Sequence, residues 1–585
     1  MAGGKSYSFG PYRLQAPGAL LYRGQELVPL PPKVSQTLLM LVENAGEVVE
    51  KDELLKKVWQ DAFVEEGSLA RTISVLRKTL SDGDKGQEYI ATLSKRGYRF
   101  VAPVRECPKP QETADRKLML AVLPFENLSG DAEQEYFSDG LTEEMITQLS
   151  RLNPERLGVI ARTSAMMFKG TKKRIAEIGK ELGAGYMLEG SVRRSGTRLR
   201  ISAQLILVAD ETHVWAENYE RSLGDILMLQ SEVARAIAQE IQITLTPREE
   251  RRLARAQRVS AKAYEAYLRG RHSWNKRTEE GMRKSISFYE EAIRIYPEYA
   301  TAHAGIADSH VMLACRGMVP AKETFRKAKA AARKALDLDG SLGEAHGSLA
   351  HVRLHDWDWE GLEKDFERAL ELDPSQAIVY YWFGEYLMSM GRPEEAIAMT
   401  WRAYQLDPLS PVIGASLAMI LYLARRFDEA LDVLKSVQEI HPEHFLPYLR
   451  MGLILIQKRQ HKQAIAALKK AVRLAKQSTE TQAALALAHA AAGEKKTASQ
   501  LTCELEKSQA QRYVLPYNIA KIYAAGGDSQ KAFAWLDKAY AEGNPDLIEL
   551  NSEPIFDGLR GEARFSNLME RIGWKVKTGP PAQAN

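Results

Sequence analysis

The chain has 585 residues, which is too long for a single hydrophobic core, so several domains are expected. Apolar residues make up 45% and charged residues 27%, as in ordinary globular proteins, and a net charge of +4 confines any nucleic-acid footprint to a local basic patch. The three cysteines lie far apart and form no CxxC pair, which argues against a disulfide framework or a zinc site and favours a reducing compartment.

The N-terminal residues, MAGGKSYSFGPYRL, contain no apolar core of the kind that a signal peptide needs. The longest apolar run near a domain junction, LMLAVLPF at residues 118–125, has the length of a strand. It falls well short of the roughly 20 residues that a membrane helix needs. A cytoplasmic protein without a membrane span is therefore expected.

Short β-like runs, separated by glycine and proline, make up residues 7–30: YSFG, YRL, ALLY and ELVPL. Pro31 and Pro32 then precede a helix predicted over residues 33–44. A second helix is predicted over residues 51–59, because apolar residues recur there at helical spacing.

A third helix is predicted over residues 64–80, VEEGSLARTISVLRKTL, whose apolar positions fall in one narrow sector: Leu69, Ile73, Leu76 and Leu80. The outer face and its flanks carry small, polar and basic residues: Ser68, Arg71, Thr72, Ser74, Val75, Arg77 and Lys78. Such a face suits the major groove, because short side chains allow close approach while Arg and Lys reach guanine or phosphate. A merely solvated helix face is the alternative interpretation.

A hairpin is predicted over residues 89–101, YIATLSKRGYRFV, with Lys95, Arg96 and Gly97 at its tip. Alternation places Tyr98 and Phe100 on one face of its second strand. A glycine beside two cations at a tight turn would let the backbone approach a phosphate or the minor groove.

These strands, helices and hairpin resemble the winged-helix domain of the bacterial OmpR/PhoB family, and its CadC-like branch in particular, over about residues 5–104. The resemblance implies that the third helix enters the major groove and that the wing touches the adjacent minor groove. By position it assigns contact with double-stranded promoter DNA to Ser68, Arg71, Thr72, Ser74, Val75 and Lys78 on the helix, and to Lys95 and Arg96 on the wing. The loop from Trp59 to Gly67 matches the segment through which family members often meet RNA polymerase.

Two departures from that family bear on how the domain would be controlled. No phosphorylatable receiver precedes the winged helix, and a polar, proline-containing linker, residues 105–116, stands where CadC-like sensors have a membrane helix. The sequence therefore supports neither a phosphorelay nor transmembrane sensing.

Residues 117–248 have an α/β pattern: strands at 118–123 and 157–161, helices at 139–152 and 173–182, a three-stranded meander over 186–219, and a final amphipathic helix. The string LAVLPFENLSGDAEQEYFSDGLTEEM resembles an α/β domain related to the N-terminal part of TolB, which brings no catalytic residues. The glycines at 183, 185 and 190 precede a strand, not a helix, so they are not a dinucleotide fingerprint. The acidic residues at 133–144 are interpreted as a solvated helix start.

A 34-residue period begins near residue 249 and is clearest in one series of mostly small residues: Ala335, Ala369, Ala403, Val437, Ala471, Leu505 and Ala539. Prolines at the exit turns, such as Pro374 and Pro408, keep the same phase. This is the tetratricopeptide signature. It predicts about eight units over residues 266–546 within an array of residues 249–575, an insertion near 316–323, a C-terminal helical cap and a disordered tail, 576–585.

Stacked repeats of this kind leave a concave groove that binds peptides or proteins. Tyr381 is a candidate for lining that groove, whereas the run Trp357-Asp358-Trp359 at a helix turn is interpreted as structural. The histidines show no spacing that suggests a metal or catalytic pair, so no metal, cofactor or enzyme activity is predicted.

The sequence thus predicts a multidomain chain: a winged helix-turn-helix of α+β type (residues 1–104), an α/β middle domain, and an all-α tetratricopeptide solenoid. The predicted function is that of a one-component, sequence-specific DNA-binding transcriptional regulator in which the array senses a partner protein or ligand. The alternative is a tetratricopeptide scaffold whose winged helix binds protein.

Overall fold

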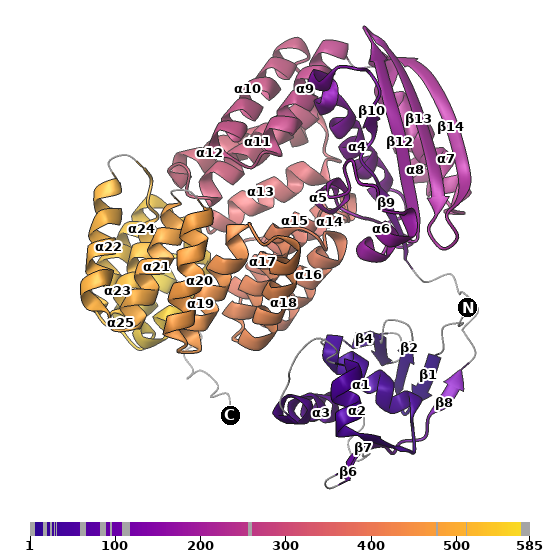
Figure 1. Ribbon diagram of the computed structural model, residues 1–585. Coiled ribbons are helices and arrows are strands. Elements are labelled where there is room, and N and C mark those ends of the chain that lie inside the picture. The colour runs from indigo at the N-terminus through magenta and orange to yellow at the C-terminus, as the bar shows by residue number, and fades with distance from the viewer. Residues whose placement is uncertain are drawn as a thin grey trace. The chain divides into compact units, whose positions relative to one another are not determined.

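The computed structural model describes residues 6–15, 20–23, 26–28, 30, 32–58, 66–81, 89–93, 96–107, 117–254, 260–475, 478–509 and 512–574. The chain divides into two compact units, Met1–Arg116 and Lys117–Asn585 (Figure 1). Among the described residues, no helix has both the length and the apolar character needed to cross a bilayer.

Unit 1 contains a five-stranded antiparallel sheet in the order β4-β3-β2-β1-β8. Its strands are β1 Ser6–Phe9, β2 Tyr12–Gln15, β3 Leu20–Arg23, β4 Glu26–Val28 and β8 Arg105–Cys107. β8 pairs with β1, with Tyr7 opposite Glu106. Residues 105–107, which the sequence analysis placed in the linker, are therefore the edge strand of this sheet.

Three helices and a second, three-stranded sheet complete unit 1: α1 Pro32–Glu43, α2 Lys51–Val58, α3 Glu66–Ser81, β5 Val48–Glu50, β6 Ile90–Leu93 and β7 Gly97–Phe100. The four apolar positions of α3 are 0–1% exposed and pack in one core with Leu38 and Phe100. The core sector predicted for the third helix is thus confirmed. β5, which the sequence analysis did not predict, pairs with β7 in the centre of the sheet.

Unit 2 begins with a sheet in the order β11-β9-β12-β13-β14, in which β9, β11 and β12 are parallel and β12 to β14 form the predicted antiparallel meander. The strands are β9 Leu118–Val122, β10 Glu126–Asn127 (paired with β12), β11 Leu157–Val159, β12 Tyr186–Ser195, β13 Arg198–Leu207 and β14 Thr212–Ser222. Helices α4 Glu135–Ser150 and α7 Ile226–Glu240 pack with the sheet in one hydrophobic core. Helix α6 Ile175–Leu182 packs with other residues of the same sheet in a second, smaller core.

The remainder of unit 2 is an array of helix pairs, and its described part contains eight of them (Figure 1). They are α9 Ala261–Trp274 with α10 Glu279–Ile295, α11 Ala300–Cys315 with α12 Ala321–Leu338, α13 Gly343–His355 with α14 Leu362–Leu372, α15 Ala377–Ser389 with α16 Pro393–Leu406, α17 Pro411–Leu423 with α18 Phe427–Ile440, α19 Phe445–Gln457 with α20 His461–Leu474, α21 Thr479–Ala491 with α22 Lys495–Ser508, and α23 Pro516–Ala525 with α24 Ser529–Glu542. The unusual length of α11 and α12 accounts for the predicted insertion.

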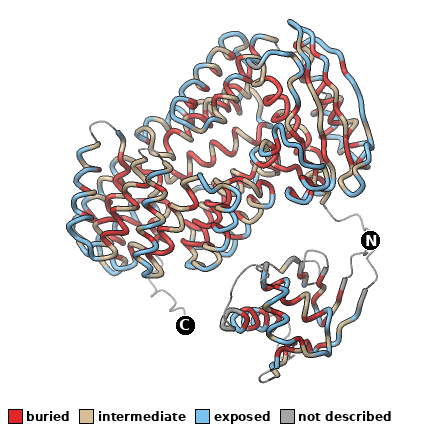
Figure 2. The backbone as a smooth tube through the Cα atoms, in the orientation of Figure 1, coloured by how far each residue is buried: buried red, intermediate tan, exposed pale blue. Residues whose placement is uncertain are grey.

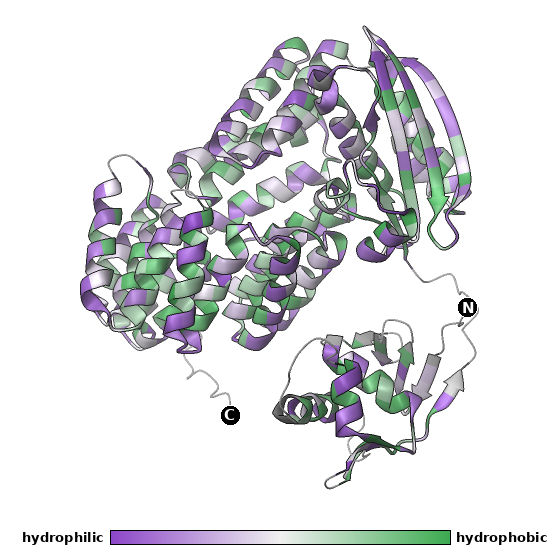
Figure 3. Ribbon diagram, viewed as in Figure 1, coloured by the Kyte–Doolittle hydropathy of each residue, from purple (hydrophilic) through white to green (hydrophobic). Residues whose placement is uncertain are grey.

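Small residues in the array allow the paired helices to touch. A Cβ on Gly384 would lie 2.4 Å from Thr400 Oγ1, and one on Gly452 would lie 2.3 Å from Leu468 Cγ. First helices such as α13 and α17 are buried along most of their length (Figure 2), while the outer helices present a polar side (Figure 3). The repeat interpretation is therefore confirmed by packing as well as by period.

A segment near the C-terminus of the chain packs against the inner face of the array. Two 3-10 helices, η3 Pro545–Glu549 and η4 Pro554–Leu559, follow α24; we call residues 545–559 the interior segment. η3 contacts α11, α13 and α15, and η4 contacts α23. Leu547, Leu550 and Phe556 are 0% exposed. The open groove that the sequence analysis expected is therefore filled by the interior segment where its residues pack.

The array also turns back on itself. Trp357 stacks on Tyr540 of α24, with ring centroids 5.0 Å apart. Trp359 stacks on Trp574 at 5.7 Å, and its indole nitrogen donates to the carbonyl of Ile572, at 2.9 Å, just past the capping helix α25 Ala563–Arg571. The interpretation of this tryptophan pair as structural is consistent with these contacts, although its partners lie in the last repeat and the cap.

The middle sheet domain docks onto the array through turns that belong to two repeats. Asp373, the aspartate of one LDP turn, accepts a hydrogen bond from Ser150 at 3.0 Å. Asp407, its equivalent in the next repeat, accepts from the backbone N–H of Ser164 at 3.0 Å and from its hydroxyl at 2.6 Å. Ser164 lies in the short helix α5 Arg162–Met166, so Asp407 satisfies a backbone donor of its first turn.

A buried charge cluster lies at the same junction. Glu143 of α4 is 8% exposed and accepts hydrogen bonds from Arg271 of α9 and, at 3.0 Å, from Asn275. Burial raises its pKa, but the charges of Arg271 and Arg162 outweigh that effect and hold the pKa below its ordinary value. The interpretation of this acidic stretch as a solvated helix start is therefore wrong for Glu143, and also for Asp139, which is 8% exposed.

Candidate nucleic-acid interface

The outer face of α3 presents a short basic and polar surface. Arg71, Ser74 and Lys78 are exposed there, and Val75 is 37% exposed. They lie opposite the buried sector because the apolar residues recur every three or four positions along the helix. These four positions therefore have the exposure that the DNA-contact prediction requires.

Thr72 and Ser68 do not join that surface in the same way. Thr72, which the sequence analysis placed on a flank, is only 7% exposed because the helix turns this position towards the core, and its DNA-contact assignment stays a prediction. Ser68 belongs to α3, but its side chain lies outside the described residues. The DNA-contact assignment for Ser68 stays a prediction.

The wing is the hairpin of β6 and β7, with Ile90 opposite Phe100 and Leu93 opposite Gly97. Arg96 is exposed at its turn, and its backbone N–H donates to the carbonyl of Leu93 at 3.0 Å. Lys95, the other predicted wing contact, lies outside the described residues. Arg96 is therefore the wing cation whose exposure the structure supports.

Gly97 has a different role from the one predicted. It is buried, and a Cβ there would lie 2.0 Å from the carbonyl oxygen of Val49 in β5. The glycine is needed because β5 passes too close to β7 for any side chain. The sequence analysis had explained this glycine by close approach to a phosphate. The packing of β5 against β7 explains it instead.

Arg77 connects the recognition helix to the wing, a role that the sequence analysis missed. Its guanidinium donates to the carbonyl of Ile90 through Nε at 3.0 Å and through Nη2 at 2.8 Å, and to the hydroxyl of Thr92 at 2.7 Å. The sequence placed Arg77 on a flank of the helix, but helical angles cannot reveal a partner 13 residues away. These hydrogen bonds connect α3 directly to the first strand of the wing.

The end of α3 is held by the N-terminal sheet. The hydroxyl of Tyr12 donates to the carbonyls of Thr79 at 3.0 Å and Leu80 at 3.1 Å, which are among the helix carbonyls without a partner in their own helix. Residues 59–65 of the candidate RNA polymerase loop lie outside the described residues, as does the side chain of Glu66.

Tyr381 lines the inner face of the array, as the sequence analysis suggested for it. With Glu385, Met419 and others it forms a small pocket that is closed on one side by Ile548 and Glu549 of the interior segment. Its hydroxyl donates to Glu385 at 2.5 Å. Tyr381 thus faces the groove, but the segment that it meets belongs to this chain.

Three family models match parts of the chain. "Transcriptional regulatory protein, C terminal" matches residues 24–100, "HilA/YgeH-like transcriptional regulator, second domain" matches residues 116–236, and "Tetratricopeptide repeat" matches residues 447–478. The first covers α3 and the wing, and the second covers the middle sheet.

Individual relatives show the same division. The chain is 28% identical to the transcriptional regulator HilA of Salmonella typhimurium over 445 residues, which is 75% of this chain and 77% of HilA. It is 39% identical to the transcriptional activator CadC of Escherichia coli over 82 residues, 14% of this chain and 16% of CadC. It is also 39% identical to "Putative adenylate cyclase 3" of Rhizobium meliloti over 246 residues, 42% of this chain and only 41% of that protein.

Sequence, fold and relatives agree at the level of domains. The exposed face of α3 and the wing lie within the regulatory-protein match, and the helix pairs include the repeat match. The chain therefore has the domain make-up of a DNA-binding transcriptional regulator: an OmpR/PhoB-type winged helix, a HilA/YgeH-like second domain and a tetratricopeptide array.

Proposed function

We propose that this chain regulates transcription by binding double-stranded promoter DNA, with α3 in the major groove and the β6–β7 wing on the adjacent backbone. The observation that supports the proposal is that Arg71 and Lys78 on α3 and Arg96 on the wing are exposed, while Arg77 hydrogen-bonds α3 to the wing. Short side chains beside these cations permit contact with base edges, and the cations supply phosphate contacts.

A salt series on selected DNA tests this assignment. The full chain is used to select binding fragments from sheared genomic DNA, and the dissociation constant of one fragment is measured at several salt concentrations. Each phosphate contact contributes about 0.9 to the slope of log K against log salt. Arg71→Ala with Lys78→Ala should therefore weaken binding and, if both contact phosphates, flatten the slope by about 1.8.

The matched control is Lys284→Ala, which removes one charge from α10, where the lysine side chain is 61% exposed. It should leave both affinity and slope unchanged. Unchanged binding by the double variant of α3 would contradict the proposal. If no selected fragment binds specifically while a protein co-purifies through the winged helix, the scaffold function replaces it.

We propose that protein partners of the array bind outside its inner face. The support is the interior segment, whose buried side chains already pack against the first helices of the repeats. A peptide would have to displace that segment to reach Tyr381. Crosslinking of a partner to inner-face positions in the full chain would contradict this placement.

Two further proposals rest on family position alone. We propose that the loop from Trp59 to Gly67 contacts RNA polymerase; alanine substitutions there should lower transcription in vitro while DNA affinity is retained. We also propose that the chain is not an enzyme. Since one relative is named as a putative adenylate cyclase, the direct test is incubation with ATP and magnesium, and formation of cyclic AMP would refute this proposal.

A further inference from the structure

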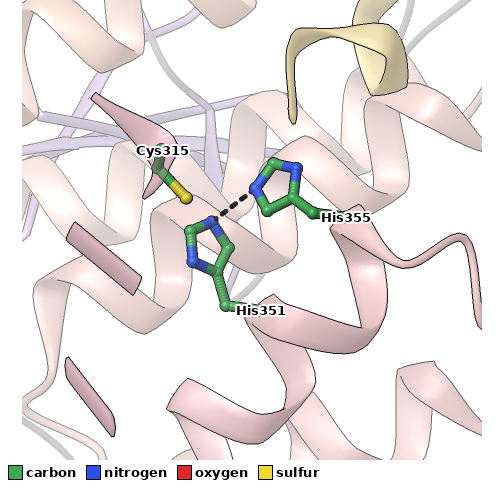
Figure 4. A group of neighbouring side chains, drawn as sticks. All are labelled: Cys315, His351 and His355. Atoms are coloured by element: carbon green, nitrogen blue, oxygen red, sulfur yellow. Dashed lines mark hydrogen bonds between the residues drawn. The ribbon is translucent and has the colours of Figure 1, made fainter. Parts of the chain in front are cut away.

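Three side chains with metal-binding atoms converge inside the array (Figure 4). Cys315 ends α11, while His351 and His355 lie one turn apart on α13. The sulfur and one nitrogen of each imidazole all lie within 4.8 Å of one another, and the two Nε2 atoms are 3.0 Å apart. In Figure 4 the cysteine sulfur points towards the gap between the two rings.

Both imidazoles are fixed by aromatic neighbours. His351 stacks on Trp382 with centroids 4.1 Å apart, and His355 stacks on Phe325 at 5.4 Å. Both histidines are buried, at 3% and 6% exposure. Their ring planes therefore cannot turn freely, so the direction of each nitrogen lone pair is set by packing.

The interior segment selects the tautomer of His355. Nδ1 of His355 lies 3.0 Å from the carbonyl oxygen of Pro545, and because a carbonyl can only accept, Nδ1 carries the proton. Nε2 then keeps its lone pair and accepts a hydrogen bond from Nε2 of His351 at 3.0 Å, so a metal ion at this place would require His351 to carry its proton on Nδ1 instead. A histidine whose second nitrogen donates to a carbonyl is the usual arrangement around a bound metal.

A carboxylate completes the surroundings. Glu385 Oε2 lies 3.6 Å from His351 Nε2, while its other oxygen accepts from the hydroxyl of Tyr381 at 2.5 Å. Glu385 is not among the three residues whose ligand atoms all lie within 4.8 Å of one another, so its carboxylate would have to move closer to the other two to join them. Around a tetrahedral zinc ion, with bonds of about 2.0–2.3 Å, ligand atoms lie roughly 3.3–3.6 Å apart, so small side-chain rotations would suffice for the three.

The donor set defines the class of ion. One thiolate and two imidazoles suit zinc or a similar late transition metal, and they do not suit the oxygen-preferring magnesium or calcium. The thiolate is the metal ligand, so an ion bound here would displace the thiol proton of Cys315.

We propose that Cys315, His351 and His355 bind one zinc-class transition-metal ion, with Glu385 as the fourth ligand. The sequence analysis predicted no metal site because it found no CxxC pair and no histidine spacing that suggested one. The spacing His-Val-Arg-Leu-His, which places two imidazoles on one helix face, was the available signal. The site would bring together three consecutive repeats and, through His355, the interior segment.

Cobalt titration of the full chain tests the proposal, because a thiolate on cobalt gives a charge-transfer band in the near ultraviolet. The chain is first treated with a chelator, and cobalt is then added to wild type and to Cys107→Ser with Cys503→Ser. In the latter, Cys315 is the only thiol. The band should saturate at one equivalent of cobalt in both proteins, with visible bands of a tetrahedral site, and zinc should abolish it.

Ligand variants provide the second measurement. Cys315→Ser should lose the band, and His355→Gln should weaken cobalt binding at least tenfold, with circular dichroism reporting whether each variant is folded. Absence of the band in wild type, or its persistence in Cys315→Ser, would overturn the proposal and leave a hydrogen-bonded histidine pair beside a packed thiol. Because the double-serine chain keeps Cys315, the result stands even if Cys315→Ser fails to fold.

Discussion

Replacing Glu553 by glutamine should destabilise the array more than any surface change. Glu553 is 0% exposed and lies in the interior segment, where Oε2 accepts from Lys521 of α23 at 2.8 Å and Oε1 from Tyr422 of α17 at 2.5 Å. The Lys521 side chain is 8% exposed. Glutamine preserves the shape but removes the carboxylate that is paired with the Lys521 ammonium, leaving Glu549 and Asp546 as the other carboxyl groups that act on it. Breaking a buried pair by removing one partner costs about 3–5 kcal/mol.

Equilibrium unfolding of the full chain in urea, followed by circular dichroism and tryptophan fluorescence, measures this cost in the transition of unit 2. Glu570→Gln on α25 is the matched control, because that side chain is exposed and its loss should change the free energy of unfolding by less than about 0.5 kcal/mol. Lys521→Met combined with Glu553→Leu should recover much of the loss. A cost below about 1 kcal/mol for Glu553→Gln would refute the reasoning.

The same pair predicts a pH dependence. Burial raises the pKa of Glu553, but the Lys521 charge and the hydrogen bonds from Lys521 and Tyr422 outweigh it and hold that pKa below 4.5. The carboxylate therefore contributes stability that is fully present above pH 4.5 and is lost as the pH falls through the lower, folded-state pKa. Glu553→Gln should lack this acid-side loss.

Three other changes test separate parts of the structure. Gly97→Ala should cost unit 1 about 1–3 kcal/mol in thermal unfolding and loosen the wing, since its Cβ would lie 2.0 Å from the Val49 carbonyl; an unchanged melting temperature would contradict that packing. Asp407→Ala should cost unit 2 about 1–3 kcal/mol and speed hydrogen exchange at Ser164, whereas the control Asp432→Ala, 66% exposed, should not. Burial and the Glu143 charge raise the pKa of Glu144 to about 7, so the folded state holds a proton that the unfolded state releases above pH 4.5, and stability falls as the pH rises towards 7. Glu144→Gln should therefore stabilise unit 2 at about pH 8 but not at about pH 5; an unchanged pH slope would refute the shift.

Patterns within short stretches of the sequence correctly predicted those features that depend only on neighbouring residues. The buried sector of α3 depends only on which residues recur at helical spacing, and its four apolar residues are indeed buried. The 34-residue period likewise predicted the helix pairs, because each small residue such as Ala369 must admit a neighbouring helix. The basic outer face of α3 followed from the same angles.

Features that depend on remote partners were missed. β8 was assigned to a linker because its partner, β1, lies at the other end of unit 1. Glu143 was interpreted as a solvated helix residue because its partner, Arg271, lies 128 residues later in the sequence. The partners of Arg77 and the approach of Cys315 to the two histidines were missed for the same reason, since neither periodicity nor spacing shows which distant side chains meet. The spacing of His351 and His355 was a local signal that the sequence analysis did not use.

The stacking of Trp359 on Trp574 changes how the array should respond to stress. In an open solenoid each repeat contacts only its neighbours, so the ends fray first and stability is a sum of local terms. Here the hydrogen bond from Trp359 joins residues 213 positions apart. Such closure raises contact order, which slows folding, and it couples the intervening repeats into one cooperative block with no free end at which unfolding could start.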